Sequence, residues 1–311
     1  MTAAPSAPRS IAVAVATRER PVGLSRLLRS LDECELPHGV EVEVLVVDND
    51  PGGGARRTLD DLELGVAVRY VHEPRLGIPF ARNRALDETG GFDLIAFVDD
   101  DEVVEPGWLV ALYDTLVGYD ADAATGPVAY ELPDHTPEWV HRGGFFEPPD
   151  LADGELRSWA ATNNVLVRRA ALVERGLRFD ETRPLFGGTD RWLFRDLASR
   201  GGTIRWSQQA LVREIVPANR TTARWLARRS FRVGIGLAME QRRTEGLAGA
   251  ARVSLRAAGG QCRYAVRRLL LTRREGRASA VHALRALAQA VGRVCGLFGI
   301  SFAEYRHVDG E

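Results

Sequence analysis

Carboxylate side chains gather directly after two apolar runs of the sequence. The run LIAFV leads into four acids at residues 99–102, and LVV leads into DND, which holds Asp48 and Asp50. Adjacent carboxylates repel one another and resist desolvation, so a buried segment that ends in them calls for a counterion. If the chain is still extended there, Asp99 and Asp101 project to one face. Two such oxygen ligands predict a Mg²⁺ or Mn²⁺ site that carries a phosphorylated substrate.

The same acidic run has a plainer interpretation. Acids that precede a helix stabilise its N-terminus, and a helix is expected to begin near Pro106. Glu102 and Glu105 would then belong to a solvated acidic turn. A plain interpretation also exists for Asp190, which follows two glycines and opens the helical run RWLFRDLASRG. On these residues alone, Asp190 is the N-cap of that helix.

The elements that must position these acids alternate between strand and helix. Apolar runs predict strands within 10–17, 41–50, 66–74, 93–101 and 121–132, and helical spacing predicts helices within 18–34, 77–90 and 106–119. A short strand and helix at 162–176, a loop and helix at 186–201 and two strands within 203–216 follow. This alternation predicts an α/β fold with a mostly parallel open sheet flanked by helices. Ligands of such sheets collect at the carboxyl ends of the strands.

The charge is divided unevenly along the 311 residues. Residues 1–218 contain 23 Arg and 36 acids, a net charge of −13, whereas residues 219–311 contain 18 Arg and 6 acids, a net charge of +12. The second segment is helical in pattern, so we expect an α-helical C-terminal region. The three cysteines are far apart and suggest neither disulfides nor zinc. Residues 1–9 read as a flexible leader, and no apolar run is long enough to span a membrane, which favours a cytoplasmic protein.

Six pieces of the sequence, in order, are similar to family-2 nucleotide-sugar glycosyltransferases of the GT-A fold. They are IAVAVATRERPVGLSRLLRSL, EVLVVDND, GIPFARNRAL, LIAFVDDDEVVEPGWL, TNNVLVRRAAL and FGGTDRWLFRDL. The resemblance covers about residues 10–235 and implies a GT-A-like catalytic domain over 10–218. It also implies an inverting, metal-dependent hexosyltransferase of class EC 2.4 that uses a nucleotide sugar, with UDP favoured over GDP or dTDP.

The resemblance implies a role for each matching residue. The donor-binding set would be Thr17, Arg18, Glu19, Asp48, Arg82, Asp99 and Asp100. Asp101 and Asp99 match the DxD motif, with Asp101 as the main ligand of Mn²⁺ or Mg²⁺. Asp190 matches the catalytic base, although Thr189 stands where the family usually has Glu. Glu214 is a further candidate ligand, because it lies where family members often place a His.

The acceptor side is predicted from an irregular segment and an Asn pair. Residues 131–160 are rich in Pro, Gly and aromatics, which favours a lid. Its side chains Trp139, Phe145, Phe146 and Trp159 would stack on an acceptor sugar or pin the lid to the core. Asn163 and Asn164 resemble a sugar-contacting loop, and an Asx turn is the equal alternative.

The basic region 219–311 has three interpretations. It is an anchor on anionic lipid, a helical cap on the acidic domain, or, least favoured, a nucleic-acid site. The expected protein is therefore cytoplasmic or peripheral on the inner face of the cell membrane, and it transfers sugar to a small molecule, glycolipid or polysaccharide precursor. A nucleotidyltransferase acting on sugar phosphates and a non-catalytic, membrane-recruited binding module are the alternatives.

Overall fold

The computed structural model describes residues 7–182 and 187–300. The chain divides into two compact units, each drawn from two separate segments. Among the described residues, the first unit combines 7–129 with 148–182 and 187–215, and the second combines 130–147 with 216–300. The aromatic segment expected as a lid is thus shared between the units, and the C-terminal region forms a unit together with 130–147.

The first unit is built on an eight-stranded sheet with the order β3-β2-β1-β4-β9-β6-β10-β8. Its strands are β1 (Ser10–Thr17), β2 (Glu41–Asp48), β3 (Ala67–His72), β4 (Leu94–Asp99), β6 (Ala123–Thr125), β8 (Leu156–Arg157), β9 (Asn164–Arg168) and β10 (Ile204–Trp206). β1 is parallel to β2 and β4, whereas β9 is antiparallel to β4 and β6. The predicted mostly parallel α/β sheet is confirmed.

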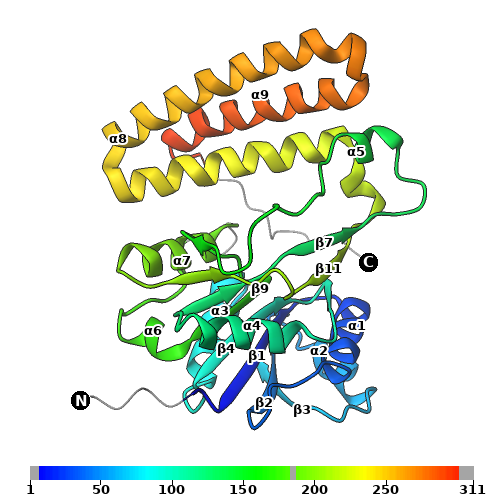
Figure 1. Cartoon of the computed structure of the whole chain (residues 1–311), viewed down its shortest axis with the longest axis vertical. Coiled ribbons are helices and arrows are strands. Elements are labelled where there is room, and N and C mark those ends of the chain that lie inside the picture. The colour runs from blue at the N-terminus through cyan, green and yellow to red at the C-terminus, as the bar shows by residue number, and fades with distance from the viewer. Residues whose placement is uncertain (1–6, 183–186, 301–311) are drawn as a thin grey trace. The chain divides into compact units, whose positions relative to one another are not determined.

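Helices cover both faces of this sheet (Figure 1). They are α1 (Pro21–Asp32), α2 (Ala55–Asp60), α3 (Ile78–Glu88), α4 (Trp108–Gly118), α6 (Arg169–Val173) and α7 (Thr189–Ser199). Val13 and Val46 face the leucines of α1 and α4, and the neighbouring Ala14 and Leu45 face α3, α6 and α7. The strands are therefore buried on both sides, which explains their continuous apolar runs.

The register of the parallel strands brings their carboxyl ends to one edge of the sheet. Thr17 pairs with Asp48 across β1 and β2, and Ala16 pairs with Asp99 across β1 and β4. The side chains that follow these positions in sequence therefore meet at the same edge. This is where ligands bind in open α/β sheets.

Two details differ from the sequence-based prediction. The segment 121–132 was expected as one strand, but Gly126 and Pro127 divide it into β6 and β7 (Val128–Glu131). Pro127 has no N–H for a ladder, which explains the break. In addition, β5 (Glu102–Val104) pairs antiparallel with β11 (Val212–Ile215), in a three-stranded sheet completed by β7. A strand beginning inside the acidic run was not predicted.

The second unit is helical, as expected for the C-terminal region. It contains α5 (Glu138–Arg142), the short 3₁₀ helix η1 (Ala218–Thr221), α8 (Ala223–Glu275) and α9 (Arg277–Leu297). Positive φ angles at Gly246 and Gly276 break the long helical run, so α8 has two legs and α9 follows as a third (Figure 1). No described helix is long and apolar enough to cross a membrane.

Candidate active site

Asp99 is the last residue of β4 and pairs with a buried arginine of α3. Its Oδ1 accepts a hydrogen bond of 3.1 Å from Nη2 of Arg82, and 40% of its side-chain surface stays exposed. Desolvation by the surrounding protein raises the pKa of Asp99, Arg82 opposes this shift, and the charges of Asp101 and Asp190 add to it. The acids of the run and the acid of α7 therefore lie within electrostatic reach of each other.

Asp100 and Asp101 lie in the turn between β4 and β5 and share one guanidinium group. Nη1 of Arg20 lies 2.8 Å from Oδ1 of Asp100 and 2.9 Å from Oδ2 of Asp101, and Oγ1 of Thr17 donates to Oδ2 of Asp100 at 2.8 Å. Burial raises the pKa of Asp100 to about 6 although Arg20 opposes it. Burial also disfavours the charge of Arg20, but the two aspartates outweigh this effect and raise its pKa. The strict alternation expected for an extended chain ends at Asp99.

Glu102 is buried, and its interpretation as part of a solvated turn is wrong. It is 1% exposed and accepts hydrogen bonds from the backbone N–H of Asp99 at 3.1 Å and Nδ2 of Asn163 at 3.0 Å. Glu214 is its register partner on β11. Burial, followed by the charges of Asp99, Asp101 and Glu214, raises the pKa of Glu102 well above its usual range. Glu214 thus lies beside the acidic run.

Asp190 is the second residue of α7, so its alternative role as N-cap is wrong. The N-cap is Gly188, whose φ of 93° is left-handed, and no side chain caps this helix. Oδ1 of Asp190 accepts a hydrogen bond of 2.8 Å from the backbone N–H of Arg191. The guanidinium carbon of Arg191 lies 4.5 Å from the centroid of the Trp159 ring. Trp159, one predicted acceptor-side aromatic, therefore contacts the residue that follows the predicted base in α7.

The end of β1 and the loop that leads from it to α1 carry three of the predicted donor-binding residues. Thr17 is buried against Asp100, and Arg18 forms an ion pair of 3.3 Å with the exposed Glu19. Glu19 has a φ of 53°, an uncommon value for a residue with a side chain. Such strain concentrates at binding loops, where surrounding structure holds it in place.

Asp48 lies at the same edge but is fully buried. Its carboxylate accepts hydrogen bonds from the backbone N–H groups of Asp50 at 3.0 Å and Ala55 at 2.8 Å, and from the Tyr70 hydroxyl at 3.1 Å. These bonds hold the turn that leads from β2 into α2. In this structure Asp48 supports the edge of the sheet from below its surface, and neither of its carboxylate oxygens is exposed to a ligand.

The two asparagines of the TNN segment have different surroundings. Asn163 is half-buried and supports Glu102, whereas Asn164 is 1% exposed. The amide of Asn164 donates to the carbonyl groups of Pro127 at 2.9 Å and Ala210 at 2.7 Å, and its Oδ1 accepts from the indole N–H of Trp108 at 2.8 Å. Asn164 therefore has a structural role in place of the expected sugar contact.

Three of the four aromatics expected in a lid pack inside the second unit. Phe146 is buried between Tyr130 and Trp225, with ring centroids 5.6 and 6.3 Å away, and Phe145 lies 4.5 Å from His282. Trp139 lies against Phe145 and beneath the guanidinium group of Arg277, at 5.0 Å. Of the two roles expected for these rings, the contacts of Phe145 and Phe146 favour pinning this segment within its own unit.

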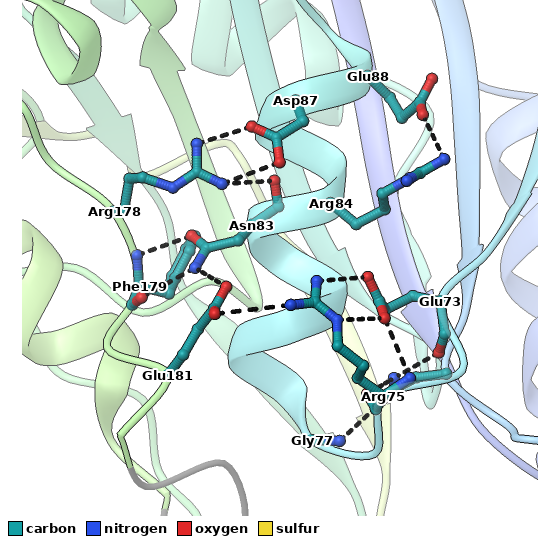
Figure 2. A network of polar contacts seen from close by, with 11 residues as sticks. Glu73, Arg75, Gly77, Asn83, Arg84, Asp87, Glu88, Arg178, Phe179 and Glu181 are labelled. Atoms are coloured by element: carbon teal, nitrogen blue, oxygen red, sulfur yellow. Dashed lines mark hydrogen bonds and ion pairs between the residues drawn. The ribbon is translucent and has the colours of Figure 1, made fainter.

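A polar network fixes α3, the helix that carries Arg82 (Figure 2). The guanidinium group of Arg178 donates two hydrogen bonds to the carboxylate of Asp87, at 2.7 and 2.9 Å. The buried Asn83 donates to the carbonyl group of Phe179 at 2.9 Å and to Glu181 at 2.7 Å. Figure 2 shows that these contacts join α3 to the segment that precedes α7 in the sequence. The sequence-based prediction missed Asn83, Glu181 and Arg20, because their partners lie far away along the chain.

The arrangement can be tested for its fit to a divalent cation. Within residues 7–182 and 187–300, no three His, Cys, Asp or Glu side chains form a ready-made metal site. Mg²⁺, however, is usually held by one or two carboxylates together with substrate phosphates. Asp99 and Asp101 offer oxygen donors, and their mutual repulsion would be relieved by a cation. The donor chemistry therefore fits a hard divalent ion bound together with a phosphorylated ligand.

Comparisons with solved structures identify the fold of this chain. The chain resembles solved GT-A glycosyltransferases. One is GalNAc-T7 with UDP, GalNAc and Mn²⁺, at a TM-score of 0.55 and 12% identity over 75% of this chain and 50% of that chain. Another is S. aureus TarS 1–349, at a TM-score of 0.54 and 14% identity over 94% of this chain and 92% of that chain. The fold is thus that of a GT-A glycosyltransferase.

Sequence relatives define the family more closely. The sequence model of Glycosyl transferase family 2 matches residues 12–177, just over half of the chain. The succinoglycan biosynthesis protein ExoM of Rhizobium meliloti is 39% identical over 227 residues, which are 72% of each chain. A pre-mycofactocin glycosyltransferase of Mycobacterium tuberculosis is 30% identical over 73% of this chain and 47% of its own length. The chain belongs to glycosyl transferase family 2, and it is a glycosyltransferase, as the resemblance of its motifs indicated.

Proposed function

We propose that this glycosyltransferase moves a sugar from a nucleoside diphosphate donor to an acceptor hydroxyl, with inversion at the anomeric carbon. The observation that supports this proposal is that the charges of Asp101 and of Asp190 on α7 both act on Asp99, the last residue of β4. We assign Asp99 and Asp101 to the diphosphate side of the donor, and Asp190, which lies on a different element, to the acceptor side. A single displacement requires groups on two sides, because nucleophile and leaving group occupy opposite sides of the sugar.

On the donor side, we assign Asp101 and Asp99 to the divalent cation and Thr17, Arg18, Glu19 and Arg82 to the nucleoside and ribose pocket. A bound Mn²⁺ or Mg²⁺ supplies Lewis-acid stabilisation of the departing diphosphate. Arg20 holds Asp100 and Asp101 in the turn, and Arg82 orients Asp99. Asp48 supports this pocket from inside, and UDP is the first nucleotide to test.

On the acceptor side, we assign the proton transfer to Asp190. One of its carboxylate oxygens takes the proton of the acceptor hydroxyl while that oxygen attacks the anomeric carbon. The bond to the diphosphate oxygen breaks, and its electron pair leaves with the nucleoside diphosphate. Trp159, stacked beneath Arg191, is placed to contact the acceptor sugar next to this base. One base is sufficient for a direct displacement of this kind.

The experiment that tests this proposal measures sugar transfer and donor hydrolysis across several nucleotide sugars with Mn²⁺. Asp190→Asn removes the proton acceptor with little change of shape, so we expect turnover to fall about 10³-fold while donor affinity is retained. Asp114→Asn, an exposed change on α4, is the matched control. Full turnover by Asp190→Asn would contradict the assignment of the base.

Glu214 is proposed as a further oxygen ligand because it lies beside Glu102 and the acidic run. Isothermal titration of Mn²⁺ and nucleotide into Glu214→Ala tests this role. We expect weaker metal-dependent nucleotide binding than in the wild type, whereas unchanged affinity removes Glu214 from the ligand set.

The acceptor we propose is a small molecule, a glycolipid or a polysaccharide precursor. The net charge of +12 in residues 219–311 supports a peripheral position on an anionic membrane surface, on the cytoplasmic side. A lipid-linked acceptor would be presented to the enzyme at such a surface.

A further inference from the structure

The helix α9 exposes a continuous row of apolar side chains. They follow one another at intervals of three or four residues, which places them on one face of the helix. The exposed fractions are 44% for Leu284, 40% for Leu287, 55% for Val291, 36% for Val294 and 79% for Phe298. A surface helix normally turns such a face toward the core. Here the buried positions are instead mostly small residues, among them Ala283, Ala286 and Ala290, with Val281 and Leu297 as the larger exceptions.

The second leg of α8, residues 247–275, exposes a similar row. Leu255, Val266, Leu269 and Leu270 are 57%, 58%, 52% and 76% exposed. The packed side of this leg again consists of small residues, Ala250, Ser254, Ala258 and Ala265. Two neighbouring helices thus bury alanine and expose leucine, the reverse of what a solvated pair would do.

The two rows lie on the same side of the helix pair. Ala265 packs with Ala283 and Ala286, and the Ser279 hydroxyl donates to the carbonyl group of Arg268 at 2.8 Å, so the helices are antiparallel (Figure 1). At 100° per residue, the exposed row is rotated from the packed positions in the same sense in both helices, by about 105° in the second leg of α8 and by about 90° in α9. Similar rotations on antiparallel helices project to a common side. The rows therefore form one apolar face.

Arginines border this apolar face. Residues 247–300 contain ten Arg and one acid, Glu275. Seven of these arginines are exposed, namely Arg252, Arg256, Arg263, Arg267, Arg273, Arg274 and Arg277. A second copy of the chain would bring like charges together at this face, and a nucleic acid would not need its leucines. An anionic bilayer satisfies both features, because its phosphates pair with arginine and its acyl region takes apolar side chains.

We propose that the face formed by the second leg of α8 and by α9 docks flat on an anionic lipid bilayer. The leucines, valines and Phe298 enter the boundary between headgroups and acyl chains, and the bordering arginines bind lipid phosphates. This inference deepens the membrane position stated in the proposed function by naming the surface that makes the contact. It does not depend on the donor, the metal or the catalytic base.

The test is flotation of the full chain with vesicles of phosphatidylcholine, with or without phosphatidylglycerol. We expect binding only to the anionic vesicles, weakened by added salt. The double substitution Leu269→Glu and Leu270→Glu should reduce binding at least about tenfold, since it replaces inserted side chains by charges. The matched control is Leu156→Glu with Val173→Glu, two exposed apolar side chains of the first unit. A second variant, Arg263→Gln with Arg267→Gln, should weaken binding about fivefold per arginine.

The location of the contact can be read directly from Cys262, which is exposed on the second leg of α8. An environment-sensitive dye on Cys262, in a Cys295→Ser background, should shift its emission to the blue on anionic vesicles. The proposal is overturned if anionic vesicles at low salt do not bind the chain, or if the leucine variant binds like the wild type. It is also overturned if sedimentation shows a dimer that the leucine variant dissociates, because a second copy then covers the face. Donor hydrolysis without vesicles tests the transferase separately.

Discussion

The two units of this protein use opposite ways of placing charge. In the first unit, charged side chains such as Asp48, Glu73, Arg82, Asp100 and Glu102 are buried among specific partners. In the described part of the second unit, Glu240 is the sole buried charged side chain, and arginines cover the surface. Buried charge is costly unless paired, so it is retained where it does chemistry or fixes a shape. Exposed charge beside apolar groups suits a large, undefined partner such as a membrane.

The largest effect on ligand binding is expected where the first unit concentrates its acids. Asp101→Ala should lower metal-dependent binding of a nucleotide sugar about 100-fold, which corresponds to about 2.7 kcal/mol. The reason is the loss of the main proposed ligand next to Arg20. Isothermal titration with Mn²⁺ and with a chelator measures this, and Asp114→Ala is the control. If the chelator weakens binding by the variant as much as by the wild type, Asp101 is not the ligand.

A second prediction concerns the polar scaffold of the same unit. Asn164→Ala should destabilise it by about 3 kcal/mol, because the Trp108 indole and two carbonyl groups lose a buried partner. Urea unfolding followed by Trp fluorescence checks the value. Asn163→Ala removes only the hydrogen bond to Glu102, so it should lower the free energy of unfolding clearly less. Equal costs for both variants would remove the distinction drawn between the two asparagines.

The stability of the second unit should be most sensitive to glycines at which two helices approach closely. A Cβ on Gly292 would meet the carbonyl oxygen of Phe231 on α8, so Gly292→Ala should cost about 2 kcal/mol. Gly260→Ala is the contrasting change, since its Cβ would approach only the flexible end of Arg263, at 3.9 Å, and it should stabilise by about 0.5–1 kcal/mol. Thermal unfolding by circular dichroism distinguishes the two. A neutral Gly292→Ala would show that the helices do not need this close approach.

The smallest effect is a pH dependence confined to the second unit. Burial, followed by the charge of Arg268, lowers the pKa of His282, whose Nε2 bonds the carbonyl group of Gly143 at 2.9 Å. The folded state therefore binds a proton less readily than the unfolded state, so stability is lost as pH falls below about 6.5. We expect a Tm decrease of about 1–2 °C between pH 7.5 and 5.5. His282→Gln should show a smaller decrease, and an identical one would implicate another group.

The main strands of the sheet and the helices beside it could be predicted from sequence because their signals are local. Continuous apolar runs mark strands that are buried on both faces, as β1, β2 and β4 are, and helical spacing marks α1 and α3. The short strand β5 could not be predicted, because Glu102 is an acid that reads as solvated. Its burial is explained by Asn163 and by the backbone of Asp99, which no local pattern reveals.

The acids of the candidate site could be proposed from the sequence, but the side chains that bind them could not. Asp99, Asp101 and Asp190 stand out because carboxylates after strands or glycines carry a chemical meaning. Arg20 does not stand out in a chain that has 41 Arg and no Lys. The role of Asn164 depends on Trp108, Pro127 and Ala210, which come together only in the folded chain. Hydrogen bonds and ion pairs between residues that are far apart in the sequence can be identified only once the fold is known.

The composition of the second unit has a consequence for biosynthesis. Val140 and Phe146 leave the ribosome long before Leu226 and Val281, the residues with which they form a common cluster. Until α8 and α9 have been translated, the apolar side chains of the segment 130–147 lack their packing partners and stay exposed. The first unit, into which this segment is inserted, can already begin to fold. A chain shortened after residue 215 should therefore be prone to aggregation, and a nascent chain paused there is a natural client for a chaperone.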